Sequence, residues 1–499
     1  MKMTSSFDFQ ILRILSFCLM VMFISCSSGD DDDDNNDVEP EPDVLELRVP
    51  RDFLTGVGSN LKLSAFQGTT DVSSKVTWAT SNPAIATINE FGQITAVENG
   101  RFSVSAKIDD QTKSASLEVF PVAGDGTTSM DLAFISFLRK FQIPGGVYGV
   151  IRNEKLVALR AYGVSDQSAG TQMEPENLFR VASVSKPITG VATMKLIEEG
   201  KLNLNDKAFE ILGDLIADVA VKDSQIFDIT INQLLHHTAG WDRGQVSDPM
   251  FNQERILSGL GLNRPATATE VVQWLATQRL NFPPGSRYAY HNLTYLVLGR
   301  VIEAVTGQTY EEYVQQAVFE PAGALSPRTA KTKLEERFED EVRYHYRNQS
   351  SPAIFDPTIN ALEPYGGMGA VEPMDSHGGW VLSIADLARF GVAVDGEPGV
   401  PDILSANSHA QMISDPGSGY GAGWFLNPGN HNHTGGMPGT AAVLWVDASR
   451  NFIIVGALNG TPIFGTQENS DFFSEYVSTF INIAISLNPR DDVDLFEKY

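Results

Sequence analysis

The order of strand-like and helix-like patterns between residues 125 and 488 is the feature that most constrains how this chain can fold. Alternating apolar residues joined at a short turn predict one hairpin over residues 146–164 and a second over residues 441–458. Amphipathic patterns of helical period occupy much of the interval between them. We therefore predict one α+β domain in which a sheet joins distant parts of the chain.

The helices of this domain are predicted from apolar spacing and from stop signals. Four segments carry the spacing of an amphipathic helix: residues 129–141, 188–202, 293–307 and 471–487. The second of these stops at Gly200, which suits a helix C-cap.

Residues 44–120 have a different character. They contain seven short runs, mostly alternating or β-branched, separated by turn residues: 45–49, 60–66, 75–80, 86–90, 93–97, 102–108 and 114–120. This pattern predicts a small all-β sandwich. Ser59 and Lys62 have a Ser-x-x-Lys spacing here, but in an alternating strand they point to opposite faces and cannot act together.

Residues 1–25 resemble a secretion signal. Lys2 and Arg13 precede the apolar run 14–24, which is too short to cross a bilayer as a helix. Cys26 follows a small residue, as in the signal of a bacterial lipoprotein, where this cysteine is lipidated. We therefore predict a lipoprotein signal peptide; an ordinary signal peptide with an incidental cysteine is the alternative.

Residues 26–43 are polar, acidic and proline-containing, so we expect a disordered tether. The expected location is that of an exported lipoprotein, at the outer membrane or cell surface of a Gram-negative bacterium.

The formal net charge of −26 argues against nucleic acid as a partner, because such a surface repels phosphates. Cys18 and Cys26 are the only cysteines, so the mature chain has no disulfide, thiol nucleophile or cysteine-bound zinc.

Ser183 and Lys186 lie three residues apart at the start of a predicted helix. Pro187 fits best in a first turn, so the helix begins near residues 183–185 and both side chains point the same way. A serine hydroxyl becomes a nucleophile when a base takes its proton, and a buried lysine can be that base because burial lowers its pKa. Taken alone, the pair is better explained as a helix N-cap and a solvated lysine.

Tyr290 and Asn292 form a Tyr-x-Asn just before the helix predicted over residues 293–307. A tyrosine can relay a proton, and an asparagine can hold a substrate carbonyl or orient the lysine. The same pattern recurs at Tyr346 and Asn348, in a charged stretch without periodicity. An aromatic residue used only for packing is the structural alternative for Tyr290.

His433, Thr434 and Gly435 precede the strand of the second hairpin. Glycines here let a substrate lie against the strand edge, and the N–H of Gly436 could be an oxyanion donor. A glycine-rich hairpin entry is the structural alternative.

In this order, the Ser-x-x-Lys, Tyr-x-Asn and His-Thr-Gly segments resemble the motifs of the serine β-lactamase and penicillin-binding superfamily, in particular its class C branch. The flanking segments are similar as well, and the resemblance covers about residues 140–485. It implies an antiparallel sheet flanked by helices, with an inserted helical region, over residues 125–488. Residues 44–120 resemble bacterial immunoglobulin-like domains of group 2, which are mostly spacers or adhesion units.

The resemblance implies a role for each matching residue. Three would be catalytic, with Ser183 as nucleophile and the others sharing acid and base work: Ser183, Lys186 and Tyr290. Five would bind substrate: Asn292, His433, Thr434, Gly435 and Gly436. The N–H groups of Ser183 and Gly436 would form the oxyanion hole. Four further residues are candidates for pocket lining but are equally explained by packing: Trp241, Gly378, Gly379 and Trp380.

We therefore predict a membrane-tethered serine hydrolase that forms an acyl-enzyme on Ser183, with no cofactor and no metal. The class C branch includes D-alanyl-D-alanine carboxypeptidases, D-aminopeptidases and carboxylesterases. The expected substrates are accordingly a D-amino-acid peptide, such as one derived from the cell wall, a carboxylic ester or a β-lactam. His433 stands where many lactamases have lysine, and a free histidine is mostly neutral at pH 7, which argues against efficient β-lactam hydrolysis.

Three alternatives remain open. The chain could be a catalytically silent binding or scaffold protein that keeps the fold. Adhesion through residues 44–120 could be its main role. A metal site could form at His431 and His433 or at the pair His236 and His237, although no His-Glu-x-x-His pattern and no cysteine ligand accompany them.

Overall fold

The computed structural model describes residues 44–126, 130–245, 247–487 and 493–499. The predicted signal peptide, its lipidation site Cys26 and the acidic tether lie outside these residues. None of the helices in the described ranges combines the length and the apolar content needed to cross a bilayer.

The predicted all-β region is confirmed. Its ten strands pair into three small sheets, with the orders β1-β4-β5, β2-β10-β9-β6 and β3-β8-β7. The strands are β1 (Leu45–Arg48), β2 (Phe53–Thr55), β3 (Asn60–Lys62), β4 (Ser64–Gln67), β5 (Thr70–Asp71), β6 (Thr77–Thr80), β7 (Ala86–Ile88), β8 (Gln93–Ala96), β9 (Gly100–Ile108) and β10 (Gln111–Phe120). Alternate residues of β9 and β10 supply its core, as the two-residue period of a strand requires.

The ten observed strands differ from the seven predicted runs in three places, because β2 and β5 were not predicted and one run is divided between β3 and β4. Residues 60–66 were expected to form one strand, but the chain changes sheets at Leu63, so β3 pairs with β8 and β4 pairs with β1. The buried Leu63 still donates its N–H to the carbonyl of Gly92, just before β8, at 2.9 Å, whereas Ser64 already pairs with Arg48 of β1. Ser59 and Lys62 bond separately to the carbonyls of Gly56 and Phe91, so this second Ser-x-x-Lys pair is not joined.

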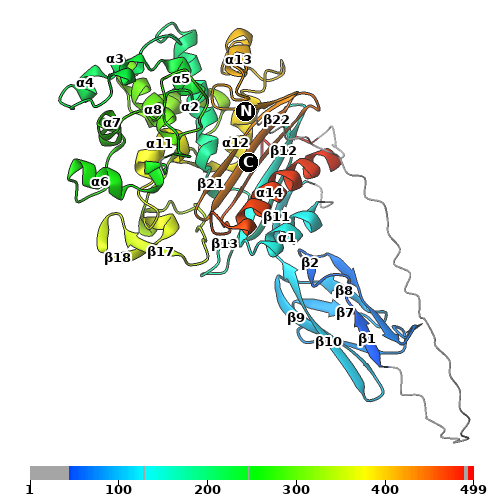
Figure 1. The fold of residues 1–499 in the computed structure, drawn as a ribbon. Helices are drawn as coiled ribbons and strands as arrows, with labels where there is room; N and C mark the ends of the chain where they lie inside the picture. Colours follow the sequence, from blue (N-terminus) through cyan, green and yellow to red (C-terminus); the bar gives the residue numbers. More distant parts are fainter. Residues whose placement is uncertain (1–43, 127–129, 246, 488–492) are drawn as a thin grey trace, which may run out of the picture. The chain divides into compact units, whose positions relative to one another are not determined.

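The second domain is built on one antiparallel sheet with the strand order β11-β13-β12-β23-β22-β21-β20 (Figure 1). Its strands are β11 (Val122–Asp125), β12 (Gly145–Arg152), β13 (Lys155–Asp166), β20 (Phe425–Asn427), β21 (Asn430–Met437), β22 (Thr440–Asp447) and β23 (Phe452–Leu458), and β14 (Thr171–Gln172) pairs with β13. The predicted sheet between distant parts of the chain forms where β12 pairs with β23, with Tyr148 opposite Gly456. The α+β class is therefore confirmed.

Both predicted hairpins are present. Asn153 and Glu154 form the first turn, and both have positive φ values, of 49° and 59°. Positive φ values at both turn residues give a two-residue turn whose twist matches that of the flanking strands. The second hairpin joins β22 to β23.

The two faces of the sheet carry separate cores. Val147 and Ile151 of β12 pack into one core, and Tyr148 and Val150 pack into the other. α1 (Asp131–Lys140) and α14 (Gln467–Ser486) cover the second face and contact each other (Figure 1). α12 (Ile384–Val392) packs on the opposite face, against β12 and β23.

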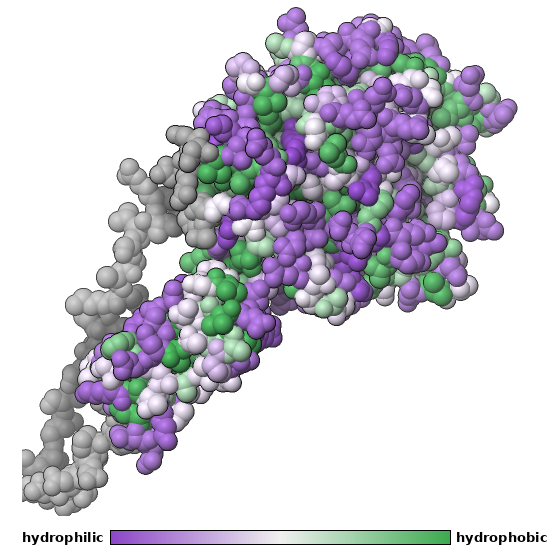
Figure 2. Space-filling view, turned by 180° about the vertical axis from the view of Figure 1, so that it is seen from behind, coloured by the Kyte–Doolittle hydropathy of each residue, from purple (hydrophilic) through white to green (hydrophobic). Residues whose placement is uncertain are grey.

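Most of the remaining helices lie between β13 and β20 in the chain and form the predicted helical insertion. They are α2 (Ser185–Glu198), α3 (Ala208–Ile211), α4 (Gly213–Ile216), α5 (Ile231–Leu235), α6 (Glu254–Leu260), α7 (Ala268–Ala276), α8 (Asn292–Thr306), α9 (Tyr310–Val314), α10 (Glu320–Ala322), α11 (Asp375–Gly378) and α13 (Ala406–Met412). The same part of the chain holds a small sheet of β15 (Leu178–Arg180), β19 (Trp380–Ser383) and β16 (Arg328–Thr329), and a hairpin of β17 (Ser350–Ala353) and β18 (Asp356–Leu362). In the view of Figure 2, apolar side chains are scattered among hydrophilic ones on the face turned to the viewer.

Candidate active site

Ser183 lies where strand β15 gives way to helix α2. A short 3₁₀ turn, η1 (Ala182–Val184), joins them, and Pro187 sits in the first turn of α2 as predicted. Ala182 has a φ of 47°, in the left-handed region that residues other than glycine rarely adopt. Backbone strain of this kind costs about 1–3 kcal/mol and concentrates at functional sites. It occurs here directly before the predicted nucleophile.

Lys186 is fully buried beneath Ser183, and its Nζ contacts three oxygen atoms. These are the Ser183 Oγ at 3.0 Å, the Asn292 Oδ1 at 2.8 Å and the carbonyl oxygen of His377 at 2.9 Å. Burial lowers the pKa of Lys186 well below its usual value, and only the more distant Asp248 carboxylate opposes this. A lysine that gives up its proton easily has a lone pair with which to accept the serine proton.

Tyr290 stands beside the same two residues. The Lys186 Nζ lies 4.9 Å from the centre of its ring. Burial raises the pKa of Tyr290, and a hydrogen bond with Ser183 partly offsets this effect. The phenol is therefore protonated at neutral pH and can donate a proton near Ser183.

Asn292 begins helix α8 and is held on both sides of its amide. Its Oδ1 accepts from Lys186, while its Nδ2 donates to the Asp248 Oδ2 at 2.9 Å. This network fixes which end of the amide faces the lysine. Asp248 was not among the predicted site residues, because an Asp-Pro pair in a sequence indicates only a helix cap, and its Oδ1 does accept the Met250 N–H at 3.0 Å.

His433 lies on β21 with its side chain buried. Its Nδ1 is 2.6 Å from the carbonyl oxygen of Thr434 and therefore carries the proton, which leaves Nε2 to accept from the Tyr420 hydroxyl at 3.3 Å. Burial, aided by the nearby Lys186, lowers the pKa of His433 to about 3. This side chain is neutral at physiological pH, as expected from the motif comparison.

Strand β21 passes directly in front of η1. A Cβ on Gly435 would lie 2.1 Å from the carbonyl oxygen of Val181 and 3.1 Å from the Ser183 nitrogen, so only glycine fits there. β20 pairs with β21 no further than Asn432, so the described strands leave the rest of that edge unpaired. The edge of β21 from Thr434 to Gly436 therefore has no strand partner among the described strands on that side, and the oxyanion role of Gly436 stays a prediction.

Two aromatic rings and one arginine lie beside Tyr290; none of them was predicted to belong to this site, and His237 was considered only as a metal ligand. The ring of the buried His237 lies 4.4 Å from that of Tyr290, and Phe425 stacks on Tyr290 at 6.0 Å. The guanidinium carbon of Arg243 lies 4.7 Å from the centre of the Tyr290 ring. Only the tertiary fold brings these residues to one place, since their sequence neighbourhoods carry no periodic signal.

The weaker candidates are mostly part of the core. Trp241 and Trp380 are buried there, and the Trp380 indole N–H donates to the Tyr310 hydroxyl at 3.0 Å. Gly378 and Gly379 follow His377, whose carbonyl, rather than its side chain, reaches Lys186. Packing therefore explains the two tryptophans.

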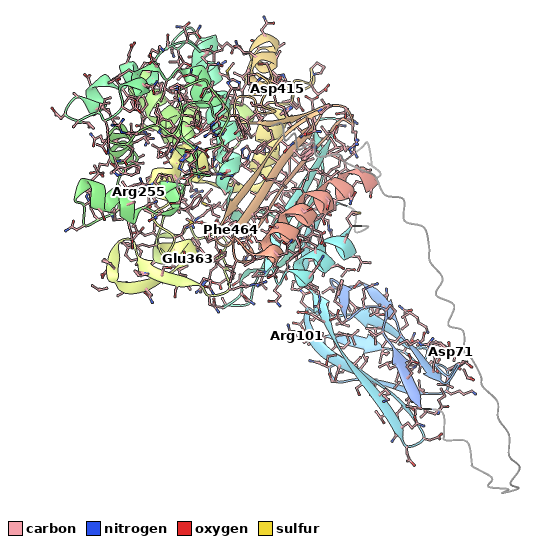
Figure 3. All side chains as sticks on the ribbon, in the orientation of Figure 1. Asp71, Arg101, Arg255, Glu363, Asp415 and Phe464 are labelled. Atoms are coloured by element: carbon pink, nitrogen blue, oxygen red, sulfur yellow. The ribbon has the colours of Figure 1, made fainter. Side chains whose placement is uncertain are left out.

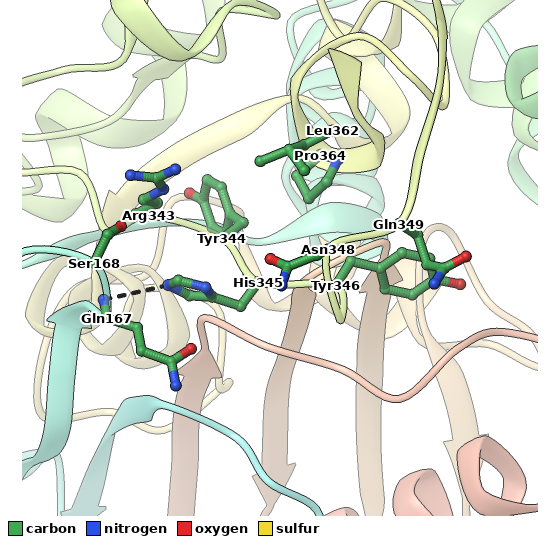
Figure 4. Close-up of a pocket in the computed structure, with 10 residues that line it drawn as sticks. All are labelled: Gln167, Ser168, Arg343, Tyr344, His345, Tyr346, Asn348, Gln349, Leu362 and Pro364. Atoms are coloured by element: carbon green, nitrogen blue, oxygen red, sulfur yellow. Dashed lines mark hydrogen bonds between the residues drawn. The ribbon is translucent and has the colours of Figure 1, made fainter. Parts of the chain in front are cut away.

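The second Tyr-x-Asn lies in a different place. Tyr346 and Asn348 line a cavity of about 240 Å³, together with His345 and Arg343, and none of the predicted site residues lines it (Figure 4). The Tyr346 hydroxyl accepts the Phe464 N–H at 2.7 Å, which is a structural contact.

The histidine pairs considered as metal ligands have other surroundings. His431 packs edge-on against Trp424, with 4.7 Å between ring centres, and the His236 Nδ1 lies 2.8 Å from the carbonyl oxygen of Asn232. Within the described ranges, no group of three or more histidine, cysteine, aspartate or glutamate side chains is arranged to hold a metal ion.

Comparisons with known proteins agree with this geometry. The family model described as Beta-lactamase matches residues 130–471, and the model described as Bacterial Ig-like domain (group 2) matches residues 50–119.

Individual relatives are distant. Protein flp of Staphylococcus aureus (strain COL) is 24% identical over 345 residues, which are 68% of this chain and 64% of that protein. The match thus spans under two thirds of that relative's length. Esterase EstB of Burkholderia gladioli is 29% identical over 309 residues, which are 59% of this chain and 77% of the esterase.

Among solved structures, a D-amino acid amidase from Ochrobactrum anthropi has the same fold. It superposes with a TM-score of 0.54 at 19% identity, and the match covers 70% of this chain and 96% of the amidase.

Proposed function

Because this chain belongs to the beta-lactamase family, we propose that it is a serine hydrolase that forms an acyl-enzyme on Ser183. One observation carries the proposal: the buried Lys186 lies 3.0 Å from the Ser183 hydroxyl and has a strongly lowered pKa. A serine next to a neutral amine has the arrangement that nucleophilic catalysis needs.

The reaction proceeds in two halves. Lys186 takes the Ser183 proton as Oγ forms a bond with the substrate carbonyl carbon. The bond from that carbon to the leaving nitrogen or oxygen then breaks, and the leaving group takes a proton from Tyr290, which Lys186 restores. Water hydrolyses the resulting ester by the same proton route in reverse, which releases the acid and frees Ser183.

The substrate class is an amide or an ester. EstB is named an esterase and the Ochrobactrum protein a D-amino acid amidase, so both reactions occur on this fold. The neutral His433 lacks the permanent charge of a lysine at the same place, which favours peptide or ester substrates over β-lactams.

The proposal is tested by covalent labelling. Intact-mass spectrometry of residues 44–499 after exposure to a fluorophosphonate should show one adduct on the wild type and none on Ser183→Ala. If neither folded chain is labelled, the chain is instead a silent binding protein that keeps the fold.

Adhesion through residues 44–120 is the second candidate, and the match of a bacterial Ig-like model to residues 50–119 favours it as an added role. Deletion of residues 44–120 should abolish surface binding and leave ester hydrolysis unchanged if the region is an adhesion unit. Unchanged surface binding would contradict it.

We propose in addition that Cys26 is lipidated and tethers the protein to a membrane, on the basis of the apolar run before it. Cys26→Ser should move the protein from the membrane fraction to the soluble fraction. A protein that stays with the membrane would refute the lipid anchor.

A further inference from the structure

Arg243 is a cation at the mouth of the Ser183 site. Its side chain is exposed, and its guanidinium carbon lies 4.7 Å from the centre of the Tyr290 ring. The Lys186 Nζ lies 4.9 Å from the same centre. The charge of Arg243 is close enough to help lower the pKa of both Lys186 and Tyr290. Arg243 therefore belongs to the electrostatic surroundings of the reacting groups.

No carboxylate neutralises this arginine within the described part of the chain. Its neighbour Asp242 is bound instead to Arg287, at 2.6 Å, and to the Gly244 N–H at 2.8 Å. A guanidinium that contacts only an aromatic face keeps its hydrogen-bond donors free for a ligand. This is unusual in a protein with a net charge of −26, where carboxylates are abundant.

The other basic groups of the site do not supply a lasting charge. His433 is neutral because burial lowers its pKa to about 3, and burial also lowers the pKa of Lys186 well below its usual value. An arginine keeps its proton at any physiological pH. Attraction of an anionic substrate at this site thus depends on Arg243.

We propose that Arg243 is a specificity residue that selects substrates whose leaving group carries a carboxylate. The proposal rests on the proposed hydrolase function and deepens it. Tyr290 donates its proton to the leaving group, so a cation held against the Tyr290 ring lies on the leaving-group side of the scissile bond. In a leaving amino acid or hydroxy acid, the carboxylate is attached one carbon away from the leaving atom, and a guanidinium can bind it with two hydrogen bonds.

The test compares two substrates that differ only in this charge: N-acetyl-D-alanyl-D-lactate and its C-terminal amide. The wild type should prefer the acid, measured as the ratio of the two kcat/KM values. In Arg243→Gln this ratio should fall by at least about tenfold, the typical worth of hydrogen bonds to a charged group. Arg243→Lys should keep part of the preference, because it retains the charge without the planar fork.

Arg255→Gln is the matched control. Arg255 is also exposed and lies over an aromatic ring, 5.6 Å from the centre of Trp274, but on helix α6 and outside the site (Figure 3). Its loss should leave the ratio as in the wild type. Raising the sodium chloride concentration should lower the wild-type ratio, because the charge pair is exposed to solvent.

The outcomes separate this proposal from the proposed function. Suppose that the fluorophosphonate labels Ser183 but that the wild type has a ratio of kcat/KM for the acid to kcat/KM for the amide near one. This result, or a ratio that Arg243→Gln leaves unchanged, overturns the role of Arg243 and leaves the hydrolase function intact. If neither compound is turned over, calorimetry on the Ser183→Ala chain decides. If the Ser183→Ala chain binds the acid more tightly than the amide, and the double variant with Arg243→Gln does not, the role of Arg243 is supported. Equal binding of acid and amide by the Ser183→Ala chain overturns it.

Discussion

In the proposed mechanism, the chemistry of the site depends on Lys186. Its amine contacts three oxygen atoms in a place that water does not reach, and the nearest carboxylate, on Asp248, is separated from it by the Asn292 amide. Desolvation exceeds the attraction of that carboxylate, so the pKa falls. A larger share of the Lys186 amine is therefore neutral at physiological pH, and the neutral amine can accept a proton from Ser183.

Lys186→Arg should lower kcat/KM by about 10²–10⁴-fold, because an arginine keeps its proton and cannot act as a base. In the wild type, kcat/KM should rise with pH as Lys186 loses its proton. It should reach its plateau well below pH 10.5, the usual pKa of lysine. A pH profile of ester hydrolysis checks both points. An arginine variant with more than a tenth of wild-type activity would contradict the assignment.

Asp248 is a positioning residue that acts through Asn292. Its charge raises the pKa of Lys186, so its removal should lower that pKa further. Asp248→Asn should therefore move the acid limb of the kcat/KM profile to lower pH, while misorientation of Asn292 lowers kcat by about tenfold. A residue with a purely structural role would lower activity without moving the limb, so an unshifted profile would refute the positioning role.

The contact between strand β21 and the turn η1 holds the two walls of the site together. Gly435→Ala should destabilise the fold by about 1–3 kcal/mol, the usual cost of overpacking, and should sharply reduce labelling of Ser183. Thermal unfolding and fluorophosphonate labelling measure the two effects.

Gly213→Ala is the control for this change. Gly213 begins helix α4, and a Cβ there would meet nothing within 4 Å. This variant should keep wild-type stability and labelling. Equal behaviour of the two variants would show that the approach of β21 to η1 is not as tight as described.

The elements that could be predicted from the sequence are those fixed by local patterns. Helix α2 and both hairpins follow from period and turn chemistry, so the shared direction of Ser183 and Lys186 was predictable. Asp248 and Arg243 were not predictable, because they lie between short elements and only tertiary packing brings them to Asn292 and Tyr290. The change of sheet at Leu63 was missed for a similar reason, since it depends on which distant strands, β8 and β1, the two halves of the run pair with.

The whole molecule buries nearly all of its histidines. Of the eight in the chain, seven have a pKa lowered chiefly by burial: His236, His237, His291, His345, His377, His431 and His433. The folded chain therefore binds fewer protons than the unfolded chain below pH 6.5. The stability linked to these groups is complete above that pH and is lost as the pH falls toward the folded values, which are about 3 for His431 and His433.

We therefore expect mild acid, below pH 6.5, to destabilise this protein. Each such histidine contributes a loss of up to about 1.4 kcal/mol per pH unit below 6.5. Five carboxyl groups act in the opposite sense, because burial raises the pKa of each, but they are fewer than the seven histidines: Asp131, Glu174, Glu303, Asp395, whose pKa rises to about 7, and Asp402. The melting temperature should therefore fall steeply between pH 6.5 and pH 4.5. A melting temperature that stays level over this range would contradict the prediction.

The pairing of β12 with β23 has a consequence for how the protein is made. The two strands come from near the beginning and near the end of the beta-lactamase domain, so the central sheet cannot close until almost the whole domain has left the ribosome. The contacts of residues 45–120 are nearer in sequence and can form earlier. Ser183 therefore contacts β21 only in one of the last steps of folding. In a truncated or nascent chain, the site around Ser183 is incomplete and we expect no catalysis.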